Sequence, residues 1–145
     1  MNYRSAQEID VPALFDVRLS VRENQQSREG LAAIGMTEAS LTDALRSDLR
    51  GWVADEAGEI VGFSMADHRD GSIVALFVAP GWEGRGCGSH LHDLAARWLF
   101  DEGYDGIWLL TGRGTRAHGF YLRRGWVPCG AANGEDVRLE LTVES

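Results

Sequence analysis

The stretch that decides the fold is residues 73–89, which read Ile-Val-Ala-Leu-Phe-Val-Ala-Pro-Gly-Trp-Glu-Gly-Arg-Gly-Cys-Gly-Ser. The apolar run Ile73–Val78 predicts a buried strand, and an amphipathic helix is predicted from Ser89. Three glycines stand at alternate positions between them: Gly84, Gly86 and Gly88. Glycine lets backbone N–H groups converge, and a helix start adds unpaired donors with a partial positive charge. The stretch therefore predicts a binding site for an anion such as phosphate or pyrophosphate.

Length and composition indicate one globular domain, expected to span residues 1–145. The 145 residues are 44% hydrophobic and 25% charged, which is ordinary for a globular protein. No apolar run reaches the roughly 20 residues that cross a bilayer, and the N-terminus lacks the apolar core of a signal peptide. We therefore expect a cytoplasmic protein without a membrane partner. The two cysteines, Cys87 and Cys129, lack metal-ligand spacing, so neither a disulfide framework nor a metal site is predicted.

The formal net charge of −8 limits the partners. Binding to nucleic-acid phosphates requires a basic face, so an acidic chain argues against nucleic acid. An acidic surface is compatible with a cationic substrate such as an amine, although solubility alone also explains the charge.

The order of predicted elements indicates a mixed α/β (α+β) fold. Strands are predicted at 2–6, 51–55, 60–67, 73–78, 107–110, 126–129 and 137–143, and helices at 8–22, 37–47, 89–103 and 115–124, with a loop or broken helix over 23–36. The strands before the glycine loop form an antiparallel meander. A helix joins the strand at 73–78 to the one at 107–110, so these two should run parallel. We expect a mostly antiparallel sheet with one parallel pair, flanked by about four helices.

The glycine loop alone does not identify its ligand. A dinucleotide fingerprint requires a third glycine or alanine where this chain has Ser89. It also follows the first strand of its domain, whereas several predicted strands precede this loop. A nucleoside-triphosphate loop ends in Gly-Lys-Ser/Thr, and this loop has no lysine. Both of these interpretations fail.

A second motif, at residues 114–126, reads Gly-Thr-Arg-Ala-His-Gly-Phe-Tyr-Leu-Arg-Arg-Gly-Trp. Together with the loop it resembles the GNAT superfamily of acyl-CoA-dependent N-acetyltransferases. The matching positions are Gly86, Gly88, Ala117, Phe120, Tyr121 and Gly125. Glu83 and Gly114 depart from the family pattern, which has Gln or Arg at the first position and commonly Asn at the second.

The resemblance implies a GNAT-like fold in which the parallel strands splay apart around acetyl-CoA. The backbone of Phe77 and Val78 would pair with the pantetheine arm, and the Val78 N–H would stabilise the oxyanion. Tyr121 would act as general acid on the CoA thiolate, with simple packing against Phe120 and Trp126 as the alternative role. Pyrophosphate would bind the N–H groups of one segment: Arg85, Gly86, Cys87, Gly88 and Ser89.

The function implied is acetyl transfer to a primary amine of a small molecule or peptide. The general base is open. Glu23, Asp67 and His68 are candidates near the substrate, and a water chain or direct use of the neutral amine are alternatives. A non-catalytic acyl-CoA-binding sensor or carrier is the competing hypothesis, while the net charge argues against a tRNA-modifying toxin. The fold also makes a homodimer one expected state.

Overall fold

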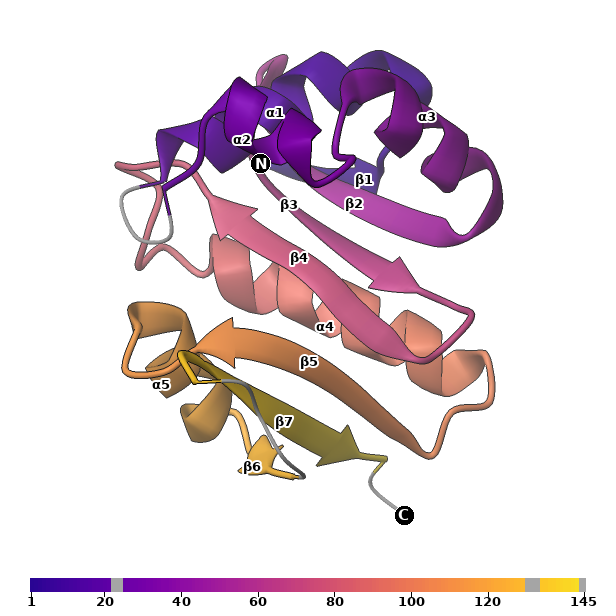
Figure 1. The fold of residues 1–145 in the computed structure, drawn as a ribbon, viewed down its shortest axis with the longest axis vertical. Coiled ribbons are helices and arrows are strands. Elements are labelled where there is room, and N and C mark those ends of the chain that lie inside the picture. The colour runs from indigo at the N-terminus through magenta and orange to yellow at the C-terminus, as the bar shows by residue number, and fades with distance from the viewer. Residues whose placement is uncertain (22–24, 130–133, 144–145) are drawn as a thin grey trace.

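The computed structural model describes residues 1–21, 25–129 and 134–143. Within these residues seven strands form one sheet in the order β1-β2-β3-β4-β5-β7-β6 (Figure 1). The strands are β1 (Asn2–Ser5), β2 (Leu49–Glu56), β3 (Glu59–Asp67), β4 (Ser72–Val78), β5 (Gly106–Gly112), β6 (Val127–Pro128) and β7 (Asp136–Thr142). Only β4 and β5 run parallel among the pairs of this described sheet. The predicted mixed sheet, mostly antiparallel with one parallel pair, is confirmed.

Helices cover the two faces of the sheet unequally. They are α1 (Val11–Ser20), which follows the short 3-10 helix η1 (Glu8–Asp10), then α2 (Arg28–Ala33), α3 (Glu38–Ser47), α4 (Cys87–Asp101) and α5 (Arg116–Arg123). The first three lie over β2, β3 and β4, and α4 and α5 lie on the opposite face (Figure 1). Helix α2 falls in the stretch predicted to be a loop or broken helix. It is only six residues long and buries only Leu31, so it carries little helical periodicity.

A bulge in β4 separates it from β5. Met65 of β3 faces Ala75, but the next β3 residue, Ala66, faces Ile73, so Val74 has no partner on β3. An extra residue of this kind bends and twists its strand. Parallel pairing between β4 and β5 is confined to Ser72 and Trp108, at the start of β4. The two strands therefore diverge toward the end of β4 that leads into the glycine loop.

Helix α4 holds this end of the sheet in place. Its side chains Leu91, Ala95 and Leu99 are fully buried, and the helix packs against β3, β4 and β5. Burying one leucine contributes about 1.5–3 kcal/mol. The packed helix thus fixes its own N-terminus beside the diverging ends of β4 and β5.

Candidate active site

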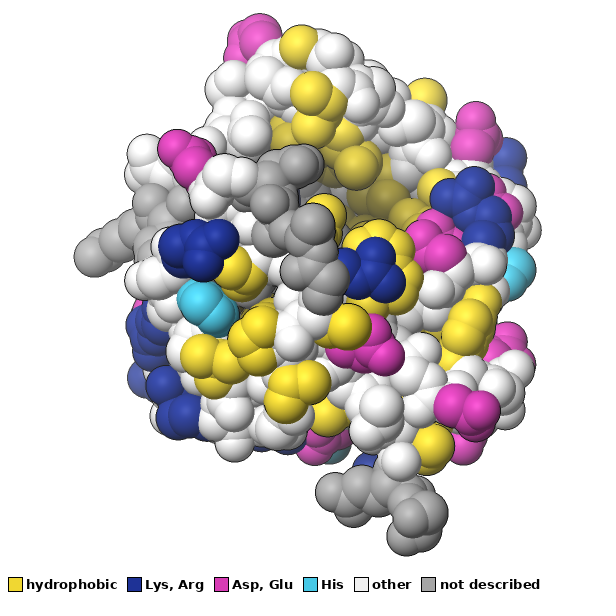
Figure 2. Space-filling model, turned by 60° about the horizontal axis from the view of Figure 1, so that its bottom comes forward, with side chains coloured by type: hydrophobic (Ala, Val, Ile, Leu, Met, Phe, Trp, Pro, Cys, Tyr) yellow, Lys and Arg dark blue, Asp and Glu magenta, His cyan; other side chains and the backbone are white. Residues whose placement is uncertain are grey.

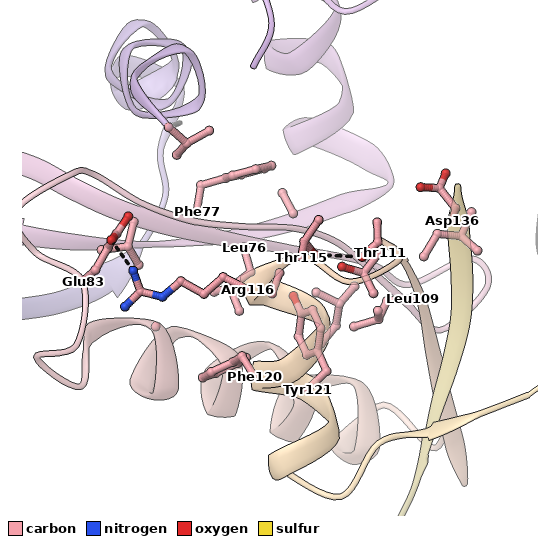
Figure 3. Close-up of a pocket in the computed structure, with 18 of the residues that line it drawn as sticks. Leu76, Phe77, Glu83, Leu109, Thr111, Thr115, Arg116, Phe120, Tyr121 and Asp136 are labelled. Atoms are coloured by element: carbon pink, nitrogen blue, oxygen red, sulfur yellow. Dashed lines mark hydrogen bonds and ion pairs between the residues drawn. The ribbon is translucent and has the colours of Figure 1, made fainter. Parts of the chain in front are cut away.

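A cleft opens where β4 and β5 diverge. Its volume is about 1340 Å³, and it is lined by both strands, the glycine loop, the first turn of α4 and one side of α5. Figure 2 shows a hollow in the surface with hydrophobic side chains on its walls, and Figure 3 shows side chains of the cleft in close-up. A deep cleft of this size suits an extended ligand with an apolar arm.

The free edge of β4 carries unused backbone groups. The Ala79 N–H donates to the Val61 carbonyl of β3 at 2.8 Å. Successive N–H groups of a strand point to opposite sides, so those of Val78 and Leu76 face the cleft. The N–H of Phe77, which was predicted to pair with the pantetheine arm, faces β3. Its ring packs near Phe63 on the face covered by α1.

The glycine loop and the start of α4 fit a pyrophosphate. Gly84 and Gly86 adopt φ values of +72° and +85°, and a side chain built at either position meets nothing within 4 Å. Gly86 is the residue before α4, and among the described residues no side chain caps the helix there. Several N–H donors therefore face open space with the partial positive charge of the helix behind them. Gly88 and Ser89 line the same cleft.

Two residues of the predicted pyrophosphate segment, Arg85 and Cys87, are not among those that line the cleft. The Arg85 guanidinium carbon lies 4.9 Å from the centre of the Trp82 ring, and the side chain is not part of the cleft lining. The Cys87 side chain is buried, where a Cβ on Gly62 would touch its sulfur. Burial raises the pKa of the Cys87 thiol, which argues against a nucleophilic role.

Glu83 faces a cation at the mouth of the cleft. Its carboxylate accepts a hydrogen bond from the guanidinium of Arg116, the first residue of α5 (Figure 3). This ion pair joins the glycine loop to α5, two segments more than thirty residues apart in sequence. The departure from the family pattern at Glu83 is thus balanced by a positive charge at Arg116, and both side chains line the cleft.

Tyr121 lies on α5 with its hydroxyl directed into the cleft (Figure 3). The ring packs 5.4 Å from Phe120 and 5.6 Å from Trp126, measured between ring centres. Burial raises the pKa of Tyr121 far above that of tyrosine in water, so the phenol keeps its proton at neutral pH. The side chain therefore packs in the core and also presents a protonated hydroxyl to the cleft.

Two of the predicted bases, Asp67 and His68, do not line the described cleft. His68 follows β3 at the end of the sheet opposite the glycine loop, where its Nε2 lies 2.7 Å from the Ser47 carbonyl oxygen. After the turn at this end of the sheet, β4 runs back to the glycine loop at the other end, and α4 spans the distance between the two ends. His68 accordingly contacts Trp98, near the far end of α4. Glu23 lies outside the described residues.

The cleft has other carboxylates that sequence reasoning missed. Glu135 and Asp136 line it at the start of β7, and Asp136 is placed there by its pairing with Gly112 of β5 (Figure 3). Only the strand register of β5 and β7 brings these two residues to the cleft.

A polar cluster behind Tyr121 was also missed. It joins Ser89, His92 and Asp93 of α4 to Arg124 and Trp126, which follow α5. The residues that contact each other across the two segments are 31–35 positions apart in sequence, so no local sequence pattern predicts their contact.

The described part of the chain has neither a metal-binding cluster nor a membrane-spanning helix. No group of three or more His, Cys, Asp or Glu side chains there has a metal-binding arrangement. None of its helices has the length and apolar character needed to cross a bilayer.

The fold and the sequence both match known acetyltransferases. The acetyltransferase (GNAT) family matches residues 12–126. PaiA N-acetyltransferase from Thermoplasma acidophilum, in complex with coenzyme A, has a TM-score of 0.83 at 16% identity, covering 99% of this chain and 100% of that chain. A ribosomal-protein alanine N-acetyltransferase from Escherichia coli has a TM-score of 0.76 at 14% identity, covering 99% and 94%. Nourseothricin acetyltransferase has a TM-score of 0.59 at 26% identity, covering 67% and 66%. No curated protein sequence matches.

These matches agree with the geometry of the cleft, in which the open edge of β4 leads to the glycine loop and the exposed N-terminus of α4. The family match also decides between the enzyme and the non-catalytic acyl-CoA-binding protein. The chain belongs to the GNAT family and is an N-acetyltransferase that uses acetyl-CoA.

Proposed function

We propose that this enzyme acetylates a primary amine of a small molecule or a peptide, and that Tyr121 protonates the sulfur that leaves. One observation carries the proposal. The cleft brings the free N–H edge of β4, the exposed start of α4 and the Tyr121 hydroxyl to one place. These three features supply a hydrogen-bond donor for a carbonyl oxygen, a phosphate site and a proton donor.

The residues for cofactor binding lie along one path. When bound, acetyl-CoA supplies an acetyl group activated as a thioester. Leu76 and Val78 would hold its extended arm as a strand is held by a sheet edge. The N–H groups from Arg85 to Ser89 would hold the pyrophosphate, and Arg116 would add positive charge beside it.

In the transfer step the amine nitrogen bonds to the acetyl carbon and the carbon–sulfur bond breaks. The Val78 N–H donates to the acetyl oxygen as that oxygen gains negative charge. Tyr121, which is protonated at neutral pH, gives its proton to the departing sulfur and regains one from water in the cleft. The proton lost by the amine passes to water in the open cleft.

The charges around the cleft support an amine acceptor. Glu135 and Asp136 line the end of the cleft away from α4 and attract a cation. The net charge of −8 acts in the same direction over longer range. The names of two structural neighbours cover both kinds of acceptor, a ribosomal-protein alanine and nourseothricin.

An acetylation screen tests the proposal. Purified enzyme and acetyl-CoA are incubated with aminoglycosides, polyamines, amino acids and peptides with free N-termini, and CoA release is followed. Release should require an amine and should be absent with N-acetylated forms of the same compounds. For the best acceptor, Tyr121→Phe should lower kcat about 10–100-fold with little change in KM for acetyl-CoA. Unchanged kcat in this variant would leave Tyr121 with a packing role only.

A further inference from the structure

A partly buried polar cluster connects α4 to the segment after α5, next to Tyr121. The Trp126 indole N–H donates to His92 Nε2 at 2.9 Å, and His92 Nδ1 lies 2.9 Å from an Asp93 carboxylate oxygen. The rings of His92 and Trp126 are buried. The Tyr121 ring contacts both, with centres 6.2 Å and 5.6 Å away.

These contacts determine the protonation of His92. An indole N–H only donates, so Nε2 must carry a lone pair, and a neutral ring then has its proton on Nδ1. This Nδ1–H donates to Asp93. The contact of 3.3 Å from Arg124 Nε to Nδ1 then joins two donors and is no hydrogen bond. Arg124 therefore acts on the cluster through Asp93 and not through the histidine.

Arg124 bridges two points of α4. One guanidinium nitrogen donates to the Asp93 carboxylate at 2.6 Å, and another donates to the Ser89 hydroxyl at 3.1 Å. The guanidinium also lies over the Phe120 ring, 5.3 Å from its centre. Ser89 lines the cleft at the pyrophosphate end, and Tyr121 lines it from α5. One side chain thus ties the first turn of α4 to the helix that carries the tyrosine.

We propose that Arg124 is a positioning residue for acetyl transfer. Through Asp93, His92 and Ser89 it fixes α5 on α4, and so fixes the Tyr121 hydroxyl relative to the pyrophosphate end of the cleft. The inference rests on the role proposed for Tyr121 above. A fixed distance between these two points matters because proton donation requires the phenol within hydrogen-bond reach of the sulfur.

A double-mutant cycle on the full-length enzyme tests the proposal. Arg124→Gln should lower kcat about 10-fold in the parent background but less than about 2-fold in the Tyr121→Phe background. Its KM for acetyl-CoA should change by less than about 3-fold. Arg124→Lys cannot donate to Ser89 and Asp93 from one planar fork, so it should recover only part of the loss. Equal kcat losses in both backgrounds would overturn the proposal.

A second readout does not depend on activity. The chain has three tyrosines, and fluorotyrosine incorporation gives each a ¹⁹F resonance; the Tyr121 line is the one absent from Tyr121→Phe. Arg124→Gln should broaden or split this line, whereas Arg97→Gln, at an exposed position of α4, should leave it unchanged. An unchanged Tyr121 line in Arg124→Gln overturns the positioning role. If Arg124→Gln changes the Tyr121 resonance but Tyr121→Phe has normal kcat, Arg124 positions the tyrosine and the proposal that Tyr121 is the general acid is wrong.

Discussion

The two edges of β4 have the same backbone chemistry but differ in how far they pair with a neighbouring strand. Toward β3 the strand is paired from Ser72 to Val78 except at the bulge residue Val74. Toward β5 it is paired only at Ser72, and the bulge at Val74 turns the rest of the edge away. The paired edge contributes to stability, while the unpaired edge keeps donors and acceptors for a ligand. The proposed binding site for an extended cofactor thus lies where the sheet omits part of its own hydrogen bonding.

The largest expected effect concerns the end of the open edge. Gly86→Val adds a side chain to the space proposed for pyrophosphate and strains a residue with φ +85°. We expect acetyl-CoA affinity to fall at least about 100-fold, measured by calorimetry. Acetyl-CoA should raise the Tm of the parent but not of this variant.

Gly58→Val is the matched control, since Gly58 has φ +93° and open space around it but lies in the turn between β2 and β3. It should lose similar stability and keep acetyl-CoA affinity. If both variants bind acetyl-CoA equally well, the loop is not the pyrophosphate site.

The paired edge should respond in the opposite way. Val61 of β3 is 1% exposed and packs in the core beneath α4. Val61→Ala should lower the free energy of unfolding by about 1–3 kcal/mol and change acetyl-CoA affinity less than about 2-fold. Denaturant unfolding and calorimetry measure the two quantities. A large loss of affinity here would mean that the two edges are not separable.

A pH effect of intermediate size is expected from the cluster that secures α5. Burial lowers the pKa of His92, and the positive charge of Arg124 adds to this, while Asp93 opposes it. The rings that contact His92, those of Phe120, Tyr121 and Trp126, carry no charge at these pH values. The folded protein thus favours neutral His92 more than the unfolded chain does.

The stability due to neutral His92 is fully present above pH ~6.5, the unfolded value. Below that pH His92 becomes protonated in the unfolded chain but stays neutral in the folded chain. The free energy of unfolding should therefore fall by up to about 1.4 kcal/mol per pH unit until the lower pKa of folded His92 is reached. Urea unfolding between pH 8 and 5 measures this. His92→Gln keeps an acceptor for Trp126 without a titrating group, and its stability should depend less on pH in this range. Equal pH dependence would assign the effect to other groups.

The smallest expected effect is at the mouth of the cleft. Glu83→Gln removes the negative charge paired with Arg116, and exposed ion pairs contribute only about 0–1 kcal/mol. Acetyl-CoA should bind up to about 5-fold more tightly, since the phosphates no longer face a carboxylate. In an Arg116→Gln background, where no cation offsets the carboxylate, the same change should have a larger effect. Weaker binding by Glu83→Gln alone would contradict the proposed balance of charge.

The features that sequence predicted are those encoded within one segment. Ile73–Val78, the glycines after it and the apolar face of α4 belong to one continuous stretch, so their strand, loop and helix follow from local backbone preference and periodicity. The motif around Tyr121 is local too. The short helix α2 escaped prediction because six residues with one buried side chain have no clear period.

The sequence by itself determined the sheet type, the family and the place of the anion loop, because positive φ at glycine and helix periodicity need no distant partner. Only the tertiary structure decided which side chains meet. It placed His68 at the end of the sheet away from the cleft. It turned the backbone N–H of Val78, and not that of Phe77, toward the cleft. It also paired Glu83 with Arg116. It also joined Arg124 to Ser89 and Asp93. Such contacts form between segments about thirty residues apart, and they exist only after α5 has packed on α4.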